Sequence, residues 1–175
     1  SYQDEIDYII SHPGRNKLIR NLCRDLKGNT LVLFSYVEKH GDVLYDLINS
    51  KVGDTRKVFF IHGGVDTEER EAARQICETE TDAIIVASYG TFSTGINIRN
   101  LHNVIFASPS KSRVRNLQSI GRILRKGENK NQATLYDIAD DISSNNLKNF
   151  TLNHLFERVK IYNEEKFDYE IIEVR

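Results

Sequence analysis

Short apolar runs alternate along this chain with segments of helical periodicity. Each apolar run is short enough for a buried strand, and each periodic segment has the length of a helix. Strands that alternate with helices predict a parallel sheet covered by helices on both faces. The expected fold class is therefore α/β with three layers. The expected strands lie at 31–35, 58–61, 83–87, 103–107 and 132–138, and the helices between them at 38–51, from Thr67 onward and at 112–125.

Both ends of the chain add helical segments to this core. Residues 2–26 have helical periodicity that is interrupted near residues 12–14, and a polar linker at 140–146 leads to a final helix near 147–165. Residues 168–174 alternate between apolar and polar positions, which is a strand pattern. The Thr67 hydroxyl is expected to cap its helix. We expect a main domain at residues 1–140 with a helical lead-in, and a helix and strand extension packed on it at 141–175.

The composition limits the class of protein. Hydrophobic residues make up 39% of the chain and charged residues 28%, which indicates a globular domain. No apolar run approaches the ~20 residues of a membrane helix, so no membrane association is expected. The chain contains no Met, which favours a processed chain or an excised piece of a larger protein.

Charge and cysteine usage are uneven along the chain. The net charge is -1, yet seven Lys and Arg residues lie between Lys111 and Lys130 with Glu128 as the one acid. Such a stretch is either a solvated surface or a local basic patch for nucleic acid. Cys23 and Cys77 fit no zinc-ligand spacing, so no metal site is expected. Two buried, reduced thiols suit a cytoplasmic protein.

The segment at 117–125 has two chemically distinct faces. On a helix of about 100° per residue, Gln118, Arg122 and Arg125 fall within roughly 60° of each other, and the apolar residues fall opposite. Two guanidinium groups one turn apart suit phosphate oxygens, because each can donate paired charge-assisted hydrogen bonds. Gly121 costs helix stability beside that line, which favours close approach of another surface. An ordinary surface helix with solvated arginines is the alternative.

The pattern Q-x-x-G-R-x-x-R in this segment resembles motif VI of superfamily 2 helicases. The resemblance implies a RecA-like domain whose helix faces an ATP held by a partner domain. It implies that Arg122 and Arg125 contact the terminal phosphate, with Arg125 as the arginine finger. It also implies that Gln118 couples the nucleotide to the nucleic-acid side.

The loop after the third strand resembles motif V of the same superfamily. It is rich in Gly, Ser and Thr, so its backbone N–H groups can approach phosphates closely. The resemblance implies that Gly95 and Asn97 belong to the nucleotide side, with Asn97 near the ribose, and that Ser88 and Thr91 contact the nucleic-acid backbone. The stretch from Ser88 to Gly95 is one residue longer than the usual pattern. A small-residue turn after a core strand is the alternative.

Two earlier segments complete the set in family order. His62 and Gly63 lie in a strand–His–Gly–helix segment that the family places beside the nucleic-acid backbone, although a lone His is more often structural. Ser35 and Tyr36 follow the first strand and resemble motif IV. An apolar helix packed on the domain would explain the C-terminal tail at 155–162, with Phe167 and Tyr169 beyond. The same tail resembles that of UvsW-type phage helicases, which remodel branched DNA in recombination and restart. This resemblance favours DNA as the partner and leaves RNA open.

The chain lacks the other half of such a motor. It has no G-x-x-x-x-G-K-[ST] loop and no Asp-Glu pair after an apolar strand. The family carries both in an upstream RecA-like domain, which would hold most of the ATP and Mg²⁺. We therefore expect no ATP hydrolysis by this chain alone. The resemblance implies an ATP-dependent helicase or translocase that works as a monomer, in the host cytoplasm if it is phage-encoded.

Two other readings stay open at this point. A mononucleotide- or dinucleotide-binding domain would have the same layered fold, but it needs a glycine cluster after the first strand, and residues 35–40 supply none. A non-catalytic module could instead use its basic stretch to dock on nucleic acid or on a protein partner.

Overall fold

The computed structural model describes residues 1–92, 98–110, 133–143 and 148–174. The predicted helix at 112–125 lies outside these residues. The described elements, in chain order, are α1 (Tyr2–Ser11), α2 (Pro13–Asp25), β1 (Thr30–Phe34), a π-helical turn η1 (Val37–Gly41), α3 (Asp42–Val52), β2 (Val58–Ile61), α4 (Asp66–Thr79), β3 (Ile84–Ser88), a 3₁₀ turn η2 (Tyr89–Phe92), β4 (Asn103–Phe106), β5 (Thr134–Asp137) and α6 (Phe150–Glu164).

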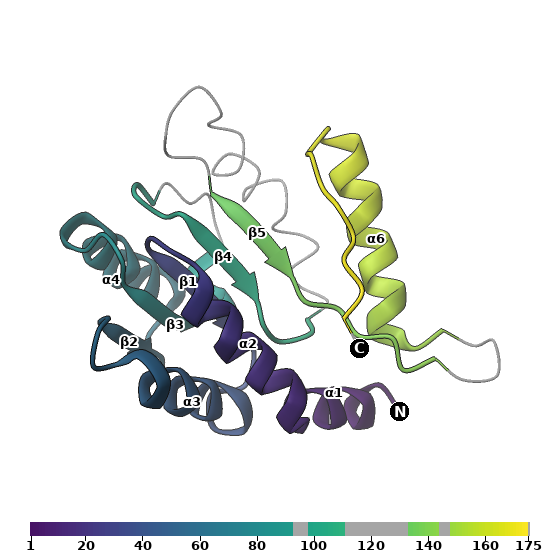
Figure 1. The fold of residues 1–175 in the computed structure, drawn as a ribbon. Helices are drawn as coiled ribbons and strands as arrows, with labels where there is room; N and C mark the ends of the chain where they lie inside the picture. Colours follow the sequence, from purple (N-terminus) through teal and green to yellow (C-terminus); the bar gives the residue numbers. More distant parts are fainter. Residues whose placement is uncertain (93–97, 111–132, 144–147, 175) are drawn as a thin grey trace.

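The five strands form one sheet in the order β2-β3-β1-β4-β5, and every neighbouring pair is parallel. The apolar runs predict all five strands to within two residues at either end. The three central strands, β1, β3 and β4, are buried on both faces of the sheet, so their apolar residues do not alternate with polar ones. Because all five strands are parallel, their carboxyl ends meet along one edge of the sheet, as Figure 1 shows.

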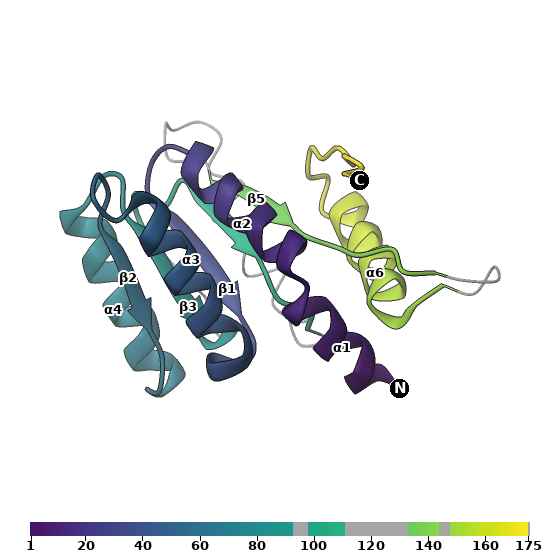
Figure 2. The same cartoon turned by 60° about the horizontal axis from the view of Figure 1, so that its bottom comes forward.

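Helices cover both faces of the sheet and give the three expected layers (Figures 1 and 2). Successive residues of β1 point to opposite faces. Leu31 and Leu33 pack with residues of α4 and α6, whereas Val32 and Phe34 pack with residues of α2 and α3. We call these the α4/α6 face and the α2/α3 face. The α/β prediction with helices on both faces is confirmed.

The C-terminal helix α6 is tied to the sheet by a buried ion pair. The Arg158 side chain is fully buried, and its Nε and Nη2 donate to the two carboxylate oxygens of Asp137 at 2.6 and 2.8 Å. Tyr162 donates its hydroxyl to the same carboxylate at 2.6 Å. Asp137 is the last residue of β5, so this cluster fixes α6 against the end of that strand.

The first helix caps the last one. The Glu5 carboxylate accepts the backbone N–H groups of Phe150 and Thr151 at 2.9 and 2.7 Å. These are the first two residues of α6, where backbone donors have no partner within the helix and where a negative charge is favourable. Tyr2 adds an edge-to-face contact with the Phe150 ring. The two ends of the chain are thus joined on one side of the domain.

Three local predictions need correction. Thr67 is not the cap of α4, because the helix begins at Asp66 after Val65, and no side chain caps it. The predicted helix at 38–51 begins instead with the π-helical turn η1. Residues 168–174 form no strand; the Tyr169 and Phe167 rings pack on Tyr162 of α6 instead of a neighbouring strand.

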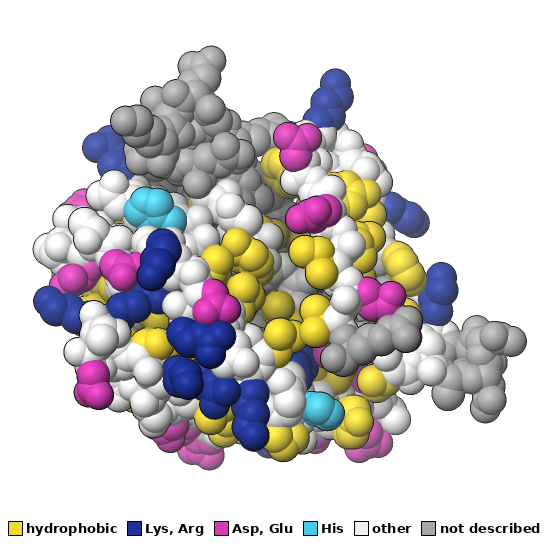
Figure 3. All heavy atoms as spheres, viewed as in Figure 1, with side chains coloured by type: hydrophobic (Ala, Val, Ile, Leu, Met, Phe, Trp, Pro, Cys, Tyr) yellow, Lys and Arg dark blue, Asp and Glu magenta, His cyan; other side chains and the backbone are white. Residues whose placement is uncertain are grey.

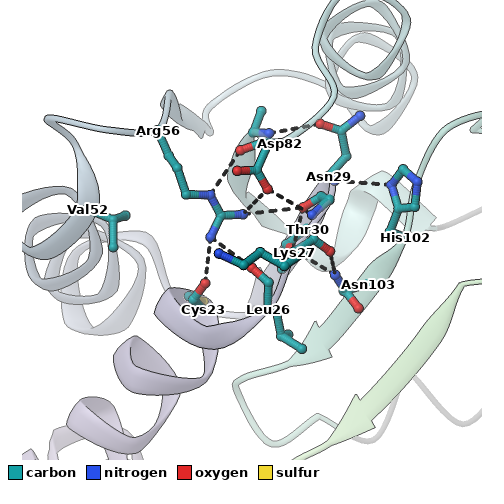
Figure 4. Close-up of polar contacts among 12 residues, drawn as sticks. Cys23, Leu26, Lys27, Asn29, Thr30, Val52, Arg56, Asp82, His102 and Asn103 are labelled. Atoms are coloured by element: carbon teal, nitrogen blue, oxygen red, sulfur yellow. Dashed lines mark hydrogen bonds and ion pairs between the residues drawn. The ribbon is translucent and has the colours of Figure 1, made fainter.

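The amino end of the sheet is closed by a polar network (Figure 4). Arg56 donates to the backbone oxygens of Asp82, Cys23, Leu26 and Gly28 at 2.8–3.3 Å. Two of these acceptors lie at the C-terminal end of α2, where unpaired carbonyls attract a positive charge. Arg56 therefore joins the end of α2 to the loops that enter β1 and β3.

Candidate nucleic-acid interface

The parallel register gathers the predicted nucleic-acid residues at the carboxyl edge of the sheet. Phe34 at the end of β1 pairs with Ser88 at the end of β3, and Ile61 of β2 pairs with Ala87. The residues that follow these strand ends share the same edge. The structure therefore brings together Ser35 and Tyr36 after β1, His62 and Gly63 after β2, and Ser88 and Thr91 at and after β3.

Ser35 and Tyr36 are exposed on this edge but make contacts within the chain. The Ser35 backbone N–H donates to the Ser108 hydroxyl at 3.0 Å, and the Ser35 hydroxyl donates to the Pro109 carbonyl at 3.4 Å. The Tyr36 ring is 36% exposed, with the Lys39 ammonium 5.6 Å from its centre. An exposed aromatic ring beside a positive charge suits a stacked base and its phosphate.

His62 and Gly63 form an open corner after β2. Both are exposed, and the His62 ring lies 4.5 Å from the Phe60 ring, so its inner side is supported by packing. Gly63 has a φ of 79°, and no atom lies within 4 Å of the place where a Cβ would be. Its backbone conformation therefore requires Gly, while the space around it is free for a ligand to approach.

Ser88 is bound to a buried carboxylate that the sequence did not predict. Its hydroxyl donates a short hydrogen bond to Glu69 of α4, whose side chain is only 5% exposed. Burial raises the pKa of the Glu69 carboxyl, Asp66 raises it further, and the Ser88 hydrogen bond and nearby His62 act in the opposite direction. Its buried surroundings thus disfavour the negative charge of Glu69, and this carboxylate lies beside Ser88, which is predicted to contact the nucleic-acid backbone.

Gly90 and Thr91, which follow Ser88 in the turn η2, are closely packed. A Cβ on Gly90 would meet the carboxylate of Asp66, so a larger residue at this position would require the Asp66 side chain to move. Thr91 is fully buried, and its hydroxyl has no hydrogen-bond partner within the described part of the chain. In this conformation Thr91 does not face solvent, whereas Ser88 is half-buried.

A buried histidine beneath Ser35 orders the same edge. His40 has no exposed surface; its Nε2 lies 2.9 Å from Asn16 Oδ1, and its Nδ1 lies against the Ser108 hydroxyl. Asn16 Nδ2 donates to the Ile10 carbonyl, which leaves Oδ1 as the acceptor toward His40. The neutral ring therefore donates from Nε2 and accepts from Ser108 at Nδ1. Burial, aided by the nearby Arg15 charge, lowers the pKa of His40 to about 3.

This relay fixes the backbone of Ser35. The Ser108 hydroxyl donates a hydrogen bond to His40 Nδ1 and accepts one from the Ser35 backbone N–H. Each hydrogen bond in this relay from Ser35 through Ser108 to His40 therefore has a defined donor and acceptor. Sequence patterns could not reveal it, because His40 and Ser108 are 68 positions apart. His40 lies in the π-helical turn η1, where the sequence predicted ordinary helix, and such turns are common at functional sites.

Several predicted residues lie outside the described part of the chain. They belong to the loop after η2 and to the segment between β4 and β5, and both connections leave from the carboxyl edge. The expected roles of these residues remain predictions. They are Gly95, Asn97, Gln118, Arg122 and Arg125.

Metal and membrane sites are absent from the parts of the chain that the structure describes. No group of three His, Cys, Asp or Glu side chains there could hold a metal ion, and no described helix is long and apolar enough to cross a membrane. Cys23 and Cys77 are buried and unbridged, as predicted, and burial raises the pKa of each thiol to about 12. Burial therefore disfavours the thiolate, which is the form of cysteine that acts as a nucleophile.

Comparison with known proteins assigns this architecture. The family model described as "Helicase conserved C-terminal domain" matches residues 14–127. The ATP-dependent DNA helicase uvsW of Enterobacteria phage T4 is 40% identical over 182 residues, which cover 97% of this chain and 36% of that protein. Protein L396 of Acanthamoeba polyphaga mimivirus, whose name describes a candidate ATP-dependent RNA helicase, is 29% identical over 89% of this chain and 31% of its own length.

Solved structures agree with this assignment. The crystal structure of T4 UvsW superposes with a TM-score of 0.74 at 39% identity, covering 97% of this chain and 36% of that one. The yeast DEAD-box splicing factor Prp28, at 20% identity and a TM-score of 0.55 over 85% of this chain and 30% of its own, shares the fold alone. The chain spans about a third of the length of these relatives. It belongs to the helicase conserved C-terminal domain family, as a RecA-like domain of superfamily 2 of the UvsW type.

Proposed function

We propose that this chain is the C-terminal motor half of an ATP-dependent DNA helicase or translocase that remodels branched DNA. The observation that carries the proposal is the shared edge. Three strands that lead into helicase-like segments end there: Phe34 pairs with Ser88 and Ile61 pairs with Ala87, so Ser35, His62 and Ser88 lie at one edge of the sheet. The 40% identity to a protein named as a DNA helicase favours DNA over RNA.

In this proposal the carboxyl edge is one wall of the nucleic-acid track. Ser35, Tyr36, His62 and Gly63 present a hydroxyl, a ring, an imidazole and an open backbone toward solvent. Ser88 reaches the same wall once Glu69 releases its hydroxyl. The backbone of a single strand would lie along this wall, with phosphates near the backbone and hydroxyl donors and a base against the Tyr36 ring.

Nucleotide chemistry is assigned to residues beyond the described part. When bound in the cleft between the two domains, Mg-ATP would favour domain closure, and release of the products would reopen the cleft. By family resemblance, Gly95 and Asn97 contact the nucleotide, while Arg122 and Arg125 approach its terminal phosphate from this domain. By the same resemblance, Mg²⁺ would be held mainly by an upstream RecA-like domain. This chain alone would then be inactive as an ATPase.

The same proposal divides the chain at residue 140. Residues 1–140 would form the motor domain, and residues 141–175 an extension whose helix is docked on it. The buried pair of Arg158 with Asp137 and the cap that Glu5 gives to α6 support such docking. The extension would therefore move with the motor domain as one rigid unit during each ATP cycle.

The decisive test is the arginine finger in the intact two-domain protein. Arg125→Ala is expected to lower the DNA-stimulated ATPase rate by about 10³-fold or more, because such an arginine stabilises the charge of the transferring phosphoryl group. Lys126→Ala, the neighbouring cation, serves as the matched control and is expected to keep the rate. Circular dichroism checks that both variants fold.

The same measurement separates the motor from a docking module. A module that only binds nucleic acid or a protein partner would show no DNA-stimulated ATPase in the intact protein. If Arg125→Ala keeps the full rate while the intact protein hydrolyses ATP, the finger assignment fails. A competition assay with single-stranded DNA and RNA of the same sequence then decides which nucleic acid stimulates hydrolysis.

A further inference from the structure

A basic surface lies on α2, a helix that covers one face of the sheet. Lys17, Arg20 and Arg24 fall within about 60° of one another on this helix, on a side away from its buried residues. Lys27 continues the line just beyond the helix. Figure 3 shows Lys and Arg side chains gathered over α2. We call these four residues the α2 stripe.

The α2 stripe concentrates positive charge in a chain whose net charge is slightly negative. Residues 13–27 contain five Lys and Arg and one acid, Asp25, whereas the whole chain has a net charge of -1. Arg15 is accounted for by the fold, since it turns inward to Asp140 and the Ala107 carbonyl. The other four basic residues face solvent or its border, and Asp25 offsets one of them through its exposed pair with Arg24.

Folding gives no reason for this arrangement. Lys17 and Arg20 are three residues apart and Arg20 and Arg24 are four apart, so each pair places like charges side by side on one helix face. Within the described residues, Arg20 hydrogen-bonds to the neutral Asn21 side chain and to no carboxylate. Lys17 and Lys27 have no carboxylate within ion-pair distance in the described part of the chain. A surface that repels itself is stabilised by an external anion.

The stripe begins where the candidate track ends. Arg15 anchors the start of α2 at the carboxyl end of β4, and Arg56 anchors its far end at the amino edge of the sheet. The helix therefore leads away from the track along the α2/α3 face. From Lys17 to Arg24 it spans about 10 Å, which corresponds to about three base pairs of duplex.

The chemistry of the stripe favours a duplex over a single strand. Surfaces that hold single strands combine positive charge with aromatic rings on which bases stack. Helix α2 contains no aromatic residue, so it offers only charge and donors for phosphates. A duplex, whose bases are already stacked on each other, presents only that backbone to a smooth basic helix.

We propose that the α2 stripe binds the phosphate backbone of a duplex arm of branched DNA while the carboxyl edge holds the tracked strand. This proposal rests on the DNA-remodelling function above and adds a second DNA contact to it. With two contacts on one domain, a branched substrate is held more tightly than either of its parts, because the second contact forms at high effective concentration.

The test compares charge reversals in the intact protein without nucleotide. The stripe variant is Lys17→Glu, Arg20→Glu, Arg24→Glu, and its control reverses three exposed cations elsewhere, Lys57, Lys148 and Lys160. Fluorescence anisotropy measures binding to a labelled three-way junction, a blunt duplex and a single strand between about 50 and 200 mM salt. The stripe variant is expected to bind the junction at least about tenfold more weakly, with a salt slope smaller by about two to three. The control is expected to match the wild type.

The proposal is overturned if the stripe variant keeps the wild-type junction affinity and salt slope. It is also overturned if single-strand affinity falls as much as junction affinity, or if the control loses as much. Where Glu substitutions disturb folding, the same three positions changed to Gln give the measurement with a smaller expected loss. Since Arg125→Ala reports on ATP hydrolysis and this assay contains no nucleotide, failure of the motor assignment leaves the stripe result interpretable.

Discussion

The two edges of the sheet use the same polar chemistry in opposite ways. At the amino edge, Arg56 contacts four carbonyls, and Asn29 uses both groups of its amide: Nδ2 donates to Glu80 and Asn100, and Oδ1 accepts the Ala83 N–H. Each of these groups therefore finds a partner within the chain. Such saturation is what a buried structural network requires.

At the carboxyl edge, comparable polar groups are less fully satisfied by the described residues. Glu69 is a buried carboxylate whose pKa is raised, and Thr91 has a buried hydroxyl without a partner among the described residues. His62 and Gly63 face solvent with their polar groups exposed. The contrast teaches that polarity alone does not mark a functional edge. Buried atoms without a partner also occur in the structural ion pairs of the described residues, at Arg15 Nη2, Asp140 Oδ2 and Arg158 Nη1. The carboxyl edge differs from them because its unsatisfied groups adjoin residues predicted to contact nucleic acid.

Removal of the Arg56 guanidinium should destabilise the polar network at the amino edge. Arg56→Met keeps the stem of the side chain but leaves the buried carbonyls of α2 and the loops without a donor, so the free energy of unfolding should fall by about 2–4 kcal/mol. Urea denaturation of the chain measures it. Arg24→Met, which removes an exposed ion pair, is the control and should change stability by less than about 0.5 kcal/mol. Equal losses in the two variants would contradict the structural role of the network.

A subtler change at the same edge should have a smaller effect. Asn29→Asp keeps the size of the side chain and its acceptor toward Ala83, but it cannot donate to the two carbonyls that Nδ2 now contacts. We expect a loss of about 2 kcal/mol in the free energy of unfolding. Asn21→Asp is the matched control, since Asn21 only accepts from Arg20 and a carboxylate accepts equally well. A neutral result for Asn29→Asp would argue against the saturation described above.

At the carboxyl edge, His40 should make stability depend on pH. The ring takes up a proton near pH 6.5 in the unfolded chain but only near pH 3 in the folded one. Because the unfolded state binds the extra proton, this contribution is complete above about pH 6.5 and is lost as the pH falls toward 3, at up to about 1.4 kcal/mol per pH unit. Urea midpoints between these limits should fall more steeply for the wild type than for His40→Gln. Parallel curves would show that the relay does not hold His40 neutral.

The sequence predicted the fold well because its signals are local and repeated. Apolar runs such as Leu31–Phe34 mark buried strands, and parallel order then forces their ends onto one edge, which is why Ser35, His62 and Ser88 could be grouped in advance. The alternation at 168–174 misled because alternation describes spacing and not partners. Those residues pack aromatic rings on α6 rather than pairing with a strand.

The contacts that tune the site could not be predicted in this way. Glu69 and Ser88 are 19 positions apart, and their meeting depends on how α4 packs against the end of β3. An acidic residue in the first turn of a helix is ordinarily interpreted as favourable to the helix dipole. Only the structure shows that Glu69 is buried and accepts a hydrogen bond from Ser88, a predicted phosphate contact. It also shows that burial raises the pKa of the Glu69 carboxyl.

The smallest expected change in stability concerns Glu69 itself, and it sharpens the comparison most. In Glu69→Gln the loss of a charge-assisted hydrogen bond to Ser88 offsets the relief of a buried charge, so the free energy of unfolding should move by less than about 0.5 kcal/mol. Single-strand affinity of the intact protein should nevertheless rise about two- to fivefold, because a negative charge beside the phosphates is removed. Glu71→Gln, at an exposed residue of the same helix that pairs with Arg74, is the control and should leave affinity unchanged.

The pH dependence of DNA binding gives a second measurement of the same effect. As the pH falls through the raised pKa of Glu69, wild-type affinity should approach that of the variant. An affinity that falls in Glu69→Gln would mean that the carboxylate positions Ser88 for DNA instead of withholding it.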